Sequence, residues 1–390
     1  MKLHKLNIGF IPLVDAAPLI AAAEMGFAEQ EGLVLNLSRS PSWSTLRDKL
    51  CFGNLDAAHM LAPVPVAGAL GLGGTAVRLE ALSVLSVNGN VIGVSRDIGA
   101  RMREAGHDFA FDNAQSAGQA LIGVIEDTLR IGVPFPFSMH AELVHYWLHA
   151  MGLKAPKAVS VHTVPPPMMA DALRAGDIDA FCVGEPWGSS SVEEGVADLL
   201  LPCPAIWAFA PEKVLATRAG WADDNAELAH RLIRALWRAA RWLSDPTSRG
   251  LTTELLSREP YLDLPPEIVE CALLGRFMIS SKGELRHVPG FVDFFTGAAG
   301  FPWRSQAEWI GQQLVQRFGL DPQEALKAQT TFRSDIYRAA LGHVAHDLPS
   351  ASAKVEGAVN EPLAVGSVGG RLILPRDAFF DGRVFEPTPG

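Results

Sequence analysis

Two side chains at expected helix starts could contact an anion. Trp43 follows an expected strand, where Ser42 or Ser44 can cap a helix. His140 lies in the first turn of another expected helix, which Ser138 caps. Free backbone N–H groups and the positive end of the helix dipole favour a negative charge at such a start. Each residue could equally belong to a packed core.

A strand exit offers further candidates. Residues 178–183 form a short apolar run that predicts a buried strand, and the turn formers that follow, beginning with Gly184 and Glu185, force a sharp exit. Ligands of open α/β sheets collect at the carboxyl ends of strands. We therefore expect this exit to form one wall of a small-molecule site, although Glu185 could simply cap a turn. Asn88 and Asn90 could either form a turn or turn their amides toward the same cleft.

Catalytic patterns are weaker. Cys51 and Cys182 lie in apolar contexts, where a thiol is inert. The sequence has no Gly-x-Ser-x-Gly elbow and no P-loop. Its four cysteines form no close pair, and its histidines form no ligand cluster. We therefore expect no enzyme, no cofactor, no metal and no disulfide framework.

The elements that must position these residues include a repeated unit. Residues 53–57 (GNLDA) match residues 176–180 (GDIDA), and both follow an amphipathic helix and lead to a proline-bearing loop. Two such βα units indicate two similar α/β lobes.

The remaining pattern alternates between strands and helices. The expected strands cover residues 6–11, 34–37, 79–87, 91–95, 121–125, 129–133 and 159–164, and the expected helices cover 18–24, 140–151, 168–174 and 225–243. Residues 260–341 are expected to be mostly helical, and 347–370 to be a polar linker. The apolar tail at 372–380 must pack on this chain or on a partner.

Composition bounds the function classes. Hydrophobic content of 48% and charged content of 19% are typical of a globular protein. The net charge of −10 argues against direct nucleic-acid binding. The sequence contains no apolar run of about 18 residues, the length that a membrane-spanning helix needs. No signal-peptide pattern precedes the first strand, which favours a cytoplasmic location.

Five long, ordered motifs resemble the nitrate/bicarbonate-binding proteins of the NrtA/CmpA family. They lie at residues 9–20 (GFIPLVDAAPLI), 42–48 (SWSTLRD), 56–63 (DAAHMLAP), 164–169 (VPPPMM) and 181–187 (FCVGEPW). The match continues through residues 207–213 and 219–222 and covers roughly residues 6–340.

The resemblance implies a periplasmic-binding-protein-like fold of type 2, with two α/β lobes around a central cleft that holds a small planar anion. We expect residues 1–86 plus 188–345 in lobe I, 87–187 in lobe II, and 346–390 as linker and tail. The ligand-binding residues that it implies are Trp43, Asn88 or Asn90, His140, Pro166, Gly184 and Glu185.

One departure concerns charge. The family's nitrate binders resemble this chain at residues 206–209 but carry a lysine where Ala208 stands. The expectation is a less cationic site. Asparagine in place of the family's glutamine also leaves the ion's identity open.

The expected absence of a leader and a C-terminal segment at residues 379–387 are similar to the NasS-type cytoplasmic nitrate/nitrite sensors. That subgroup implies a partner, an ANTAR-domain antiterminator of the NasT type that is released on anion binding and controls nitrate assimilation. The alternative is the substrate-binding component of an ABC transporter. A desulfinase-like or pyrimidine-synthase-like enzyme on this fold would need a reactive thiol or a His pair in the cleft.

Overall fold

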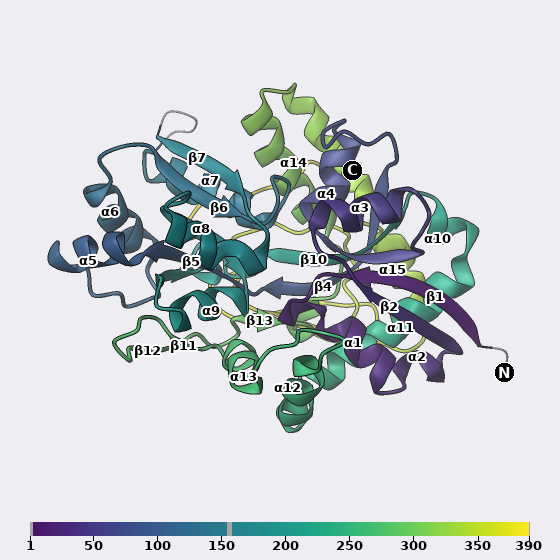
Figure 1. The fold of residues 1–390 in the computed structure, drawn as a ribbon. Helices are drawn as coiled ribbons and strands as arrows, with labels where there is room; N and C mark the ends of the chain where they lie inside the picture. The colour runs from purple at the N-terminus through teal and green to yellow at the C-terminus, as the bar shows by residue number, and fades with distance from the viewer. Residues whose placement is uncertain (1–2, 154–157, 390) are drawn as a thin grey trace.

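The computed structural model describes residues 3–153 and 158–389, which form two α/β lobes joined side by side (Figure 1). The sheet of the first lobe has the strand order β13-β4-β10-β3-β1-β2. Its strands are β1 (His4–Phe10), β2 (Leu33–Arg39), β3 (Ala57–Leu61), β4 (Leu79–Asn88), β10 (Pro211–Arg218) and β13 (Val292–Asp293). The β1, β2 and β3 strands are parallel, as βα units require, and β10 runs antiparallel between β3 and β4.

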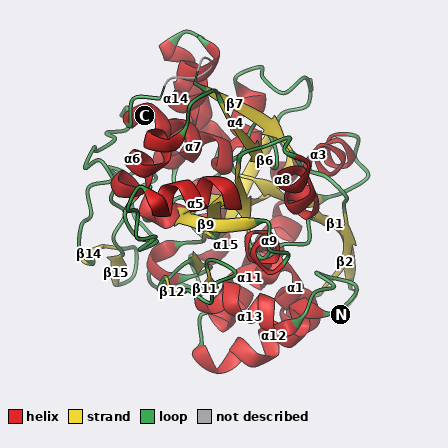
Figure 2. Cartoon of the chain, turned by 60° about the vertical axis from the view of Figure 1, so that its left-hand side comes forward, coloured by secondary structure: helices red, strands yellow, loops and turns green. Residues whose placement is uncertain are grey.

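The sheet of the second lobe has the order β7-β6-β8-β5-β9. Its strands are β5 (Asn90–Ser95), β6 (Leu129–Val133), β7 (Val159–Thr163), β8 (Ala180–Gly184) and β9 (Ala197–Pro202). The expected boundary at residue 187 is therefore too early, because β9 pairs with β5. Figure 2 shows helix α5 (Arg96–Glu104) lying along this edge strand.

Helices cover both sheets. The first lobe carries α1 (Ala17–Glu24), α2 (Phe27–Gln30), α3 (Trp43–Cys51), α4 (Pro63–Ala69), α10 (Trp221–Asp224), α11 (Ala226–Leu243), α12 (Arg249–Ser257), α13 (Pro266–Leu274), α14 (Arg304–Phe318) and α15 (Ser334–Leu341). The second lobe carries α5, α6 (Ala114–Val124), α7 (Met139–Ala150), α8 (Met169–Ala175) and α9 (Trp187–Glu193). None of the helices in the described ranges is long and apolar enough to cross a bilayer.

The expected strand at residues 121–125 is wrong, because most of it belongs to α6. Asn113 caps this helix by accepting from the Ser116 backbone N–H. Helix α6 packs closely on α7, and a Cβ on Gly118 would lie 2.9 Å from Met151. The apolar run therefore serves a helix face and not a strand.

The expected helix at residues 225–243 is confirmed as α11, and the expected strand at 129–133 is confirmed as β6. The region from residue 260 to 341 is largely helical but also contains the hairpin β11 (Arg276–Met278) and β12 (Leu285–His287). The Leu199 backbone N–H of β9 donates to the Ile279 carbonyl, so this segment of the C-terminal half crosses to the second lobe.

Two short crossovers join the sheets. Strand β4 ends at Asn88 and β5 begins at Asn90, with only Gly89 between them. Asn88 has φ 61° and Gly89 has φ 102°, a left-handed region that Asn and Gly tolerate best. The predicted turn is therefore real, but it passes the chain from one lobe to the other. The second crossover runs from β9 to β10 through residues 203–210.

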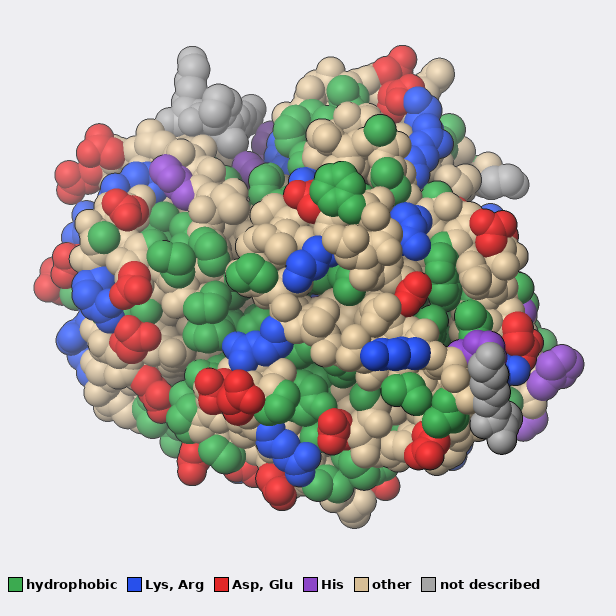
Figure 3. All heavy atoms as spheres, turned by 45° about the vertical axis from the view of Figure 1, so that its right-hand side comes forward, with side chains coloured by type: hydrophobic (Ala, Val, Ile, Leu, Met, Phe, Trp, Pro, Cys, Tyr) green, Lys and Arg blue, Asp and Glu red, His purple; other side chains and the backbone are tan. Residues whose placement is uncertain are grey.

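The C-terminal segment packs on this chain. It includes the hairpin β14 (Leu363–Gly366) and β15 (Arg371–Leu374). Phe379 stacks on Trp207 with ring centroids 4.8 Å apart, and the Ala208 backbone N–H donates to the Ala378 carbonyl. The tail therefore covers the second crossover. On the face shown in Figure 3, acidic and basic side chains are interspersed.

Candidate functional site

A cluster of polar side chains is buried where the two lobes meet. Each member is at most 3% exposed, although charged and polar residues are seldom buried without a partner or a function. The first lobe contributes Asp15 from a 3-10 turn, Trp43 from the start of α3, His59 from β3, and Glu212 and Lys213 from β10; the second contributes Asn90 from β5 and His140 from α7.

Local sequence explains how two of these side chains reach the cluster. Ser42 caps α3 by accepting from the Thr45 backbone N–H, and this places Trp43 at the first helical position. Ser138 caps α7 in the same way, and this places His140 in its first turn. Both expected helix starts are thus confirmed, and they face the junction from opposite lobes.

Lys213 is the cation of the cluster. Its Nζ lies 2.8 Å from Asp15 Oδ2 and 2.8 Å from Glu212 Oε1. Burial lowers the pKa of Lys213, but the two carboxylates outweigh burial and raise it. The same Nζ lies 5.7 Å from the centroid of the Trp43 ring. The lysine therefore stays charged in a site without solvent exposure.

Asp15 is held as an anion. Burial raises its pKa, but Lys213 and His59 outweigh burial and lower it below its ordinary value. His59 Nε2 lies 2.9 Å from Asp15 Oδ1, and the His59 ring is 5.7 Å from the Trp43 ring. Asp15 thus positions both the lysine and a ring that packs on the tryptophan.

Burial shifts the pKa values of Glu212 and His140 in the direction of their neutral forms. Burial raises the pKa of Glu212 although Lys213 opposes this. Burial, and then Lys213, holds the pKa of His140 well below its ordinary value. His140 Nδ1 lies 3.4 Å from Glu212 Oε1. A neutral imidazole has one nitrogen to donate and one to accept.

Several polar atoms of this cluster make no hydrogen bond within the described residues. They are Trp43 Nε1, Asp15 Oδ1, Glu212 Oε2 and both ring nitrogens of His59 and of His140. Asn90 lies against Glu212, whose pKa it lowers, yet its amide has no hydrogen bond of good geometry. Buried polar groups without partners are rare in native structures, and a bound ligand is one physical reason for them.

The structure brings together four of the predicted site residues: Trp43, Asn90, His140 and Gly184. A Cβ on Gly184 would lie 3.4 Å from Asn90 Oδ1 and 3.8 Å from Asp15 Oδ2, so this glycine lines the cluster. Asn88 has another role. Its amide donates to the Ala208 carbonyl at 2.8 Å and accepts from the Ala210 backbone N–H at 3.2 Å. It ties one crossover to the other, and Asn90 is the amide that faces the site.

Glu185 lies beside the cluster and not in it. Its Oε2 accepts from the Ser189 backbone N–H at 3.2 Å, and burial raises its pKa to about 7. Its carbonyl accepts from the Val14 backbone N–H at 3.2 Å, which joins the lobes. Pro166 is buried at the start of a 3-10 turn, and no described contact joins it to the cluster.

Sequence reasoning missed Asp15, His59, Glu212 and Lys213. The expectation of a site less cationic than that of the family's nitrate binders, drawn from Ala208, stays a prediction, and within the cluster the cation Lys213 pairs with two carboxylates. The available signal was the Glu212-Lys213 pair near the start of β10, a strand that continues with the apolar residues 214–216. A buried strand accepts such a pair only where its charges are compensated.

The described part of the chain holds no group of three metal-ligating side chains. Cys182 and Cys203 lie with their sulfur atoms 3.5 Å apart in the core, and burial raises the pKa of Cys182. A buried thiol with a raised pKa is a poor nucleophile. The cluster therefore fits binding of a ligand better than covalent catalysis.

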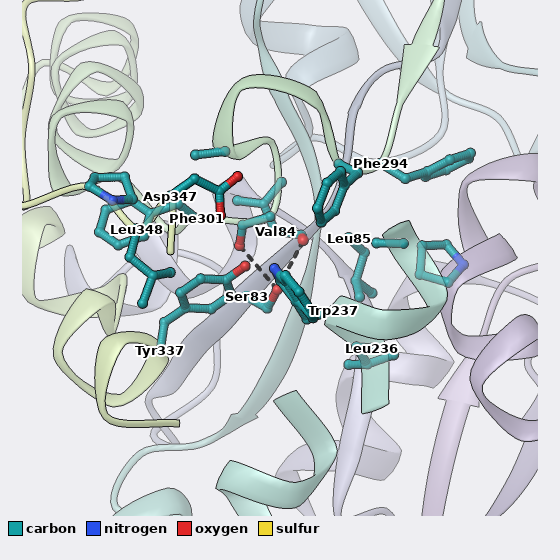
Figure 4. Close-up of a pocket in the computed structure, with 16 residues that line it drawn as sticks. Ser83, Val84, Leu85, Leu236, Trp237, Phe294, Phe301, Tyr337, Asp347 and Leu348 are labelled. Atoms are coloured by element: carbon teal, nitrogen blue, oxygen red, sulfur yellow. Dashed lines mark hydrogen bonds between the residues drawn. The ribbon is translucent and has the colours of Figure 1, made fainter. Parts of the chain in front are cut away.

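Two hollows elsewhere in the described structure are not lined by any of the predicted ligand-binding residues. A cavity of about 20 Å³ lies in the first lobe between β4, α11 and α15, near Ser83, Trp237 and Tyr337 (Figure 4). It has room for about one water molecule. A groove of about 650 Å³ separates α7 from α14, and the ion pair between the buried Glu142 and the partly exposed Arg317, at 2.7 Å, lies on its wall.

The profile of the NMT1-like family matches residues 1–257. The chain belongs to the NMT1-like family. It is 27% identical over 395 residues to the nitrate/nitrite binding protein NrtA of Synechococcus elongatus, covering 98% of this chain and 83% of that protein. The crystal structure of the periplasmic nitrate-binding protein NrtA from Synechocystis PCC 6803 superposes with a TM-score of 0.82, at 26% identity, over 98% of this chain and 96% of that one. The family resemblance and the expected periplasmic-binding-protein fold are thus confirmed.

A further relative is the nitrate import ATP-binding protein NrtC of Synechococcus elongatus, 33% identical over 350 residues, which are 88% of this chain and 51% of that protein. The chain thus spans about half the length of the NrtC relatives that it matches.

Proposed function

We propose that this NMT1-like family member binds a small planar oxyanion, nitrate or nitrite first, in the cluster between the lobes. The observation that carries the proposal is the set of buried donors without partners, Trp43 Nε1 and the His140 ring, beside a buried cation. Relatives named as nitrate or nitrite binding proteins support the same ligand class.

The chemistry of the walls fits such an ion. A trigonal oxyanion has acceptor atoms in one plane and needs donors around its edge. Trp43, His140, Asn90 and Lys213 carry such donors from both lobes. Burial of all four side chains excludes water, which strengthens each charge-assisted hydrogen bond. The ion would also join the lobes, since its donors come from each.

A binding experiment tests this function. Thermal unfolding and titration calorimetry with nitrate, nitrite, bicarbonate and chloride should show stabilisation by nitrate or nitrite, about 2.7 kcal/mol at 100 times the Kd. Trp43→Ala should abolish the response. Trp43→Phe, which keeps a ring but loses the N–H, should weaken it about tenfold, as expected for one hydrogen bond to a charged group. No response to nitrate or nitrite at millimolar concentration would refute the proposal.

For the use of this binding we propose a cytoplasmic sensor, which holds an ANTAR-domain antiterminator of nitrate assimilation and releases it when the anion binds. A ligand shifts an equilibrium between conformations only by its different affinity for them, and a site built from both lobes has that property. The alternative is the binding component of a nitrate-type or bicarbonate-type ABC importer, which the names of the NrtA and NrtC relatives support.

The two uses differ in their partner. The purified chain, mixed with an ANTAR-domain protein, should give a complex on size-exclusion chromatography that dissociates when nitrate is added. Trp43→Ala should form the same complex and keep it in nitrate. If no complex forms, and the chain instead stimulates ATP hydrolysis by a reconstituted importer, the sensor proposal fails and the alternative holds.

A further inference from the structure

Glu212 stands between the fixed charges of the cluster and its neutral donors. Its Oε1 lies 2.8 Å from Lys213 Nζ and 3.4 Å from His140 Nδ1. Its Oε2 has no hydrogen bond within the described residues, although the side chain is fully buried. The Ala62 backbone N–H donates to its carbonyl at the exit of β3. One oxygen of a rigidly placed carboxyl group is therefore left for a ligand.

The titratable groups that face Glu212 leave little room for another negative charge. Lys213 is the cation, Asp15 is an anion that pairs with the same lysine, and burial lowers the pKa values of His59 and His140. Behind the strand lie the thiols of Cys182 and Cys203, of which the Cys182 thiol is held neutral by burial. With Glu212 ionised, two carboxylates share one lysine, and a bound monovalent anion would add a second uncompensated charge.

Burial makes that arrangement unfavourable. Like charges a few ångströms apart, without water between them, favour the protonation state that removes one of them. Glu212 is the group that can take up a proton, since Asp15 has two partners that hold its charge while Glu212 is already displaced toward its neutral form by burial.

We propose that Glu212 selects the anion through its own proton: protonated, it donates to an oxyanion that has no hydrogen, such as nitrate or nitrite; ionised, it accepts from an anion that carries an O–H, such as hydrogencarbonate. The inference rests on the proposed function, that an oxyanion occupies this cluster. Where Glu212 is ionised in the free protein, nitrate binding takes up one proton from solvent onto it and hydrogencarbonate binding takes up none; where Glu212 is already protonated, nitrate binding takes up none and hydrogencarbonate binding releases one. No covalent bond changes in either case.

Calorimetry tests this without any variant. Nitrate titrations at pH 6, 7, 8 and 9, each in two buffers with different protonation enthalpies, give the number of protons taken up. The expected number rises toward one with pH, and the nitrate Kd rises about tenfold per pH unit once Glu212 is ionised in the free protein. Hydrogencarbonate, compared at equal concentration of that ion, should show no such rise.

Glu212→Gln sharpens the test, because the neutral amide donates at every pH but never ionises. Its nitrate affinity should vary less than about threefold from pH 6 to 9, and its preference for nitrate over hydrogencarbonate should no longer depend on pH. Glu142→Gln is the matched control. Glu142 is another buried carboxyl group whose pKa burial raises to about 7, but it pairs with Arg317 away from the cluster. This variant should keep the pH dependence of the original chain.

The outcomes separate the two claims. If no oxyanion binds at any pH, the proposed function fails. If nitrate binds with no proton uptake and a constant Kd from pH 6 to 9, the role of Glu212 is refuted and the proposed function stands. If Glu212→Gln keeps the original slope, another group carries the proton and the assignment to Glu212 is wrong.

Discussion

Strand β3 in the first lobe and strand β8 in the second each begin after an aspartate that holds the neighbouring parallel strand. Asp56 Oδ2 accepts from the Asn7 backbone N–H at 2.7 Å, and Asp179 Oδ2 accepts from the Arg130 backbone N–H at 2.9 Å. In both pairs the aspartate N–H donates back to the same residue's carbonyl. The repeated Gly-x-x-Asp-Ala unit thus has one structural meaning in both lobes.

The two strands differ where they reach the cluster. His59 of β3 contacts Asp15, whereas Cys182 at the matching position of β8 is buried in the core. At the exits, Ala62 donates its N–H to the Glu212 carbonyl, and Glu185 holds the start of α9. The first lobe therefore supplies the charged side chains of the cluster together with Trp43, and the second lobe supplies the neutral side chains of Asn90 and His140. The aspartate before the strand fixes how β3 and β8 begin in the same way in both lobes. The chemistry of the site depends on the few residues further along each strand and at its end.

The largest effect should come from removing the cation of the first lobe. Lys213→Met leaves Asp15 and Glu212 buried side by side without a counter-charge, and we expect a loss of about 3–5 kcal/mol in the free energy of unfolding, together with loss of nitrate binding. Chemical denaturation and calorimetry measure the two effects.

A matched control exists in the C-terminal segment. Lys354 also lies between two buried carboxylates, Glu356 and Asp377, with its own side chain 11% exposed, and it belongs to the C-terminal segment and not to the cluster. Lys354→Met should lower stability in a similar way and leave nitrate affinity unchanged. If Lys213→Met unfolds at the same denaturant concentration as the original chain, then Lys213 does not stabilise the buried carboxylates of Asp15 and Glu212.

This contrast also shows how far the sequence could predict the molecule. The βα pattern, the caps at Ser42 and Ser138 and the repeated aspartates are local signals, so the two lobes and the positions of Trp43 and His140 could be predicted. These features depend on hydrogen bonds within a few residues of one another or on strand periodicity.

The charged residues of the cluster, Asp15, Glu212 and Lys213, could not be predicted as one site, because Asp15 is far from the other two in the chain. Asp15 contacts Lys213, although all five strands of the second lobe's sheet lie between them in the sequence. Asn88 and Asn90 read as equivalent turn residues, and only the antiparallel pairing of β5 with β8 turns Asn90 toward the site. The prediction of a strand at residues 121–125 was wrong because a short apolar run does not distinguish a strand from the apolar face of a helix.

A smaller effect should follow from the exit of the second lobe. Burial raises the pKa of Glu185 to about 7, above its unfolded value near 4.5, so the folded chain binds this proton more tightly. Stability from this group is fully present below about pH 4.5, falls as the pH rises to about 7, and stays lower above it. Glu185→Gln should flatten this region and raise stability at pH 8 by up to roughly 3 kcal/mol.

Denaturation curves from pH 4 to 8 measure the change. The exposed Glu104 on α5 offers a control, and Glu104→Gln should alter stability by less than about 0.5 kcal/mol at each pH. A Glu185→Gln variant with the same pH profile as the original chain would show that this carboxyl group is solvated in solution.

The smallest effects should come from the shared entrances. Asp56→Ala and Asp179→Ala each remove the acceptor of one backbone N–H, and each should cost about 1–2 kcal/mol, as expected for one unsatisfied donor in a half-buried position. Arg130 also pairs with Asp179 at 2.6 Å, but its side chain is 42% exposed, so Arg130→Ala should cost less than about 1 kcal/mol. The Arg130 guanidinium is therefore an additional contact at the start of β8, whereas the contact between the aspartate and the backbone is common to both lobes.

Equal losses of stability for Asp56→Ala and Asp179→Ala would support the same structural role of the aspartate in both lobes. The contrary outcome is a loss of stability for Asp179→Ala that matches the loss for Arg130→Ala, with no loss for Asp56→Ala. It would show that the ion pair, and not the backbone contact, stabilises the start of β8. The two repeated units would then be alike in sequence but not in the interaction that stabilises them.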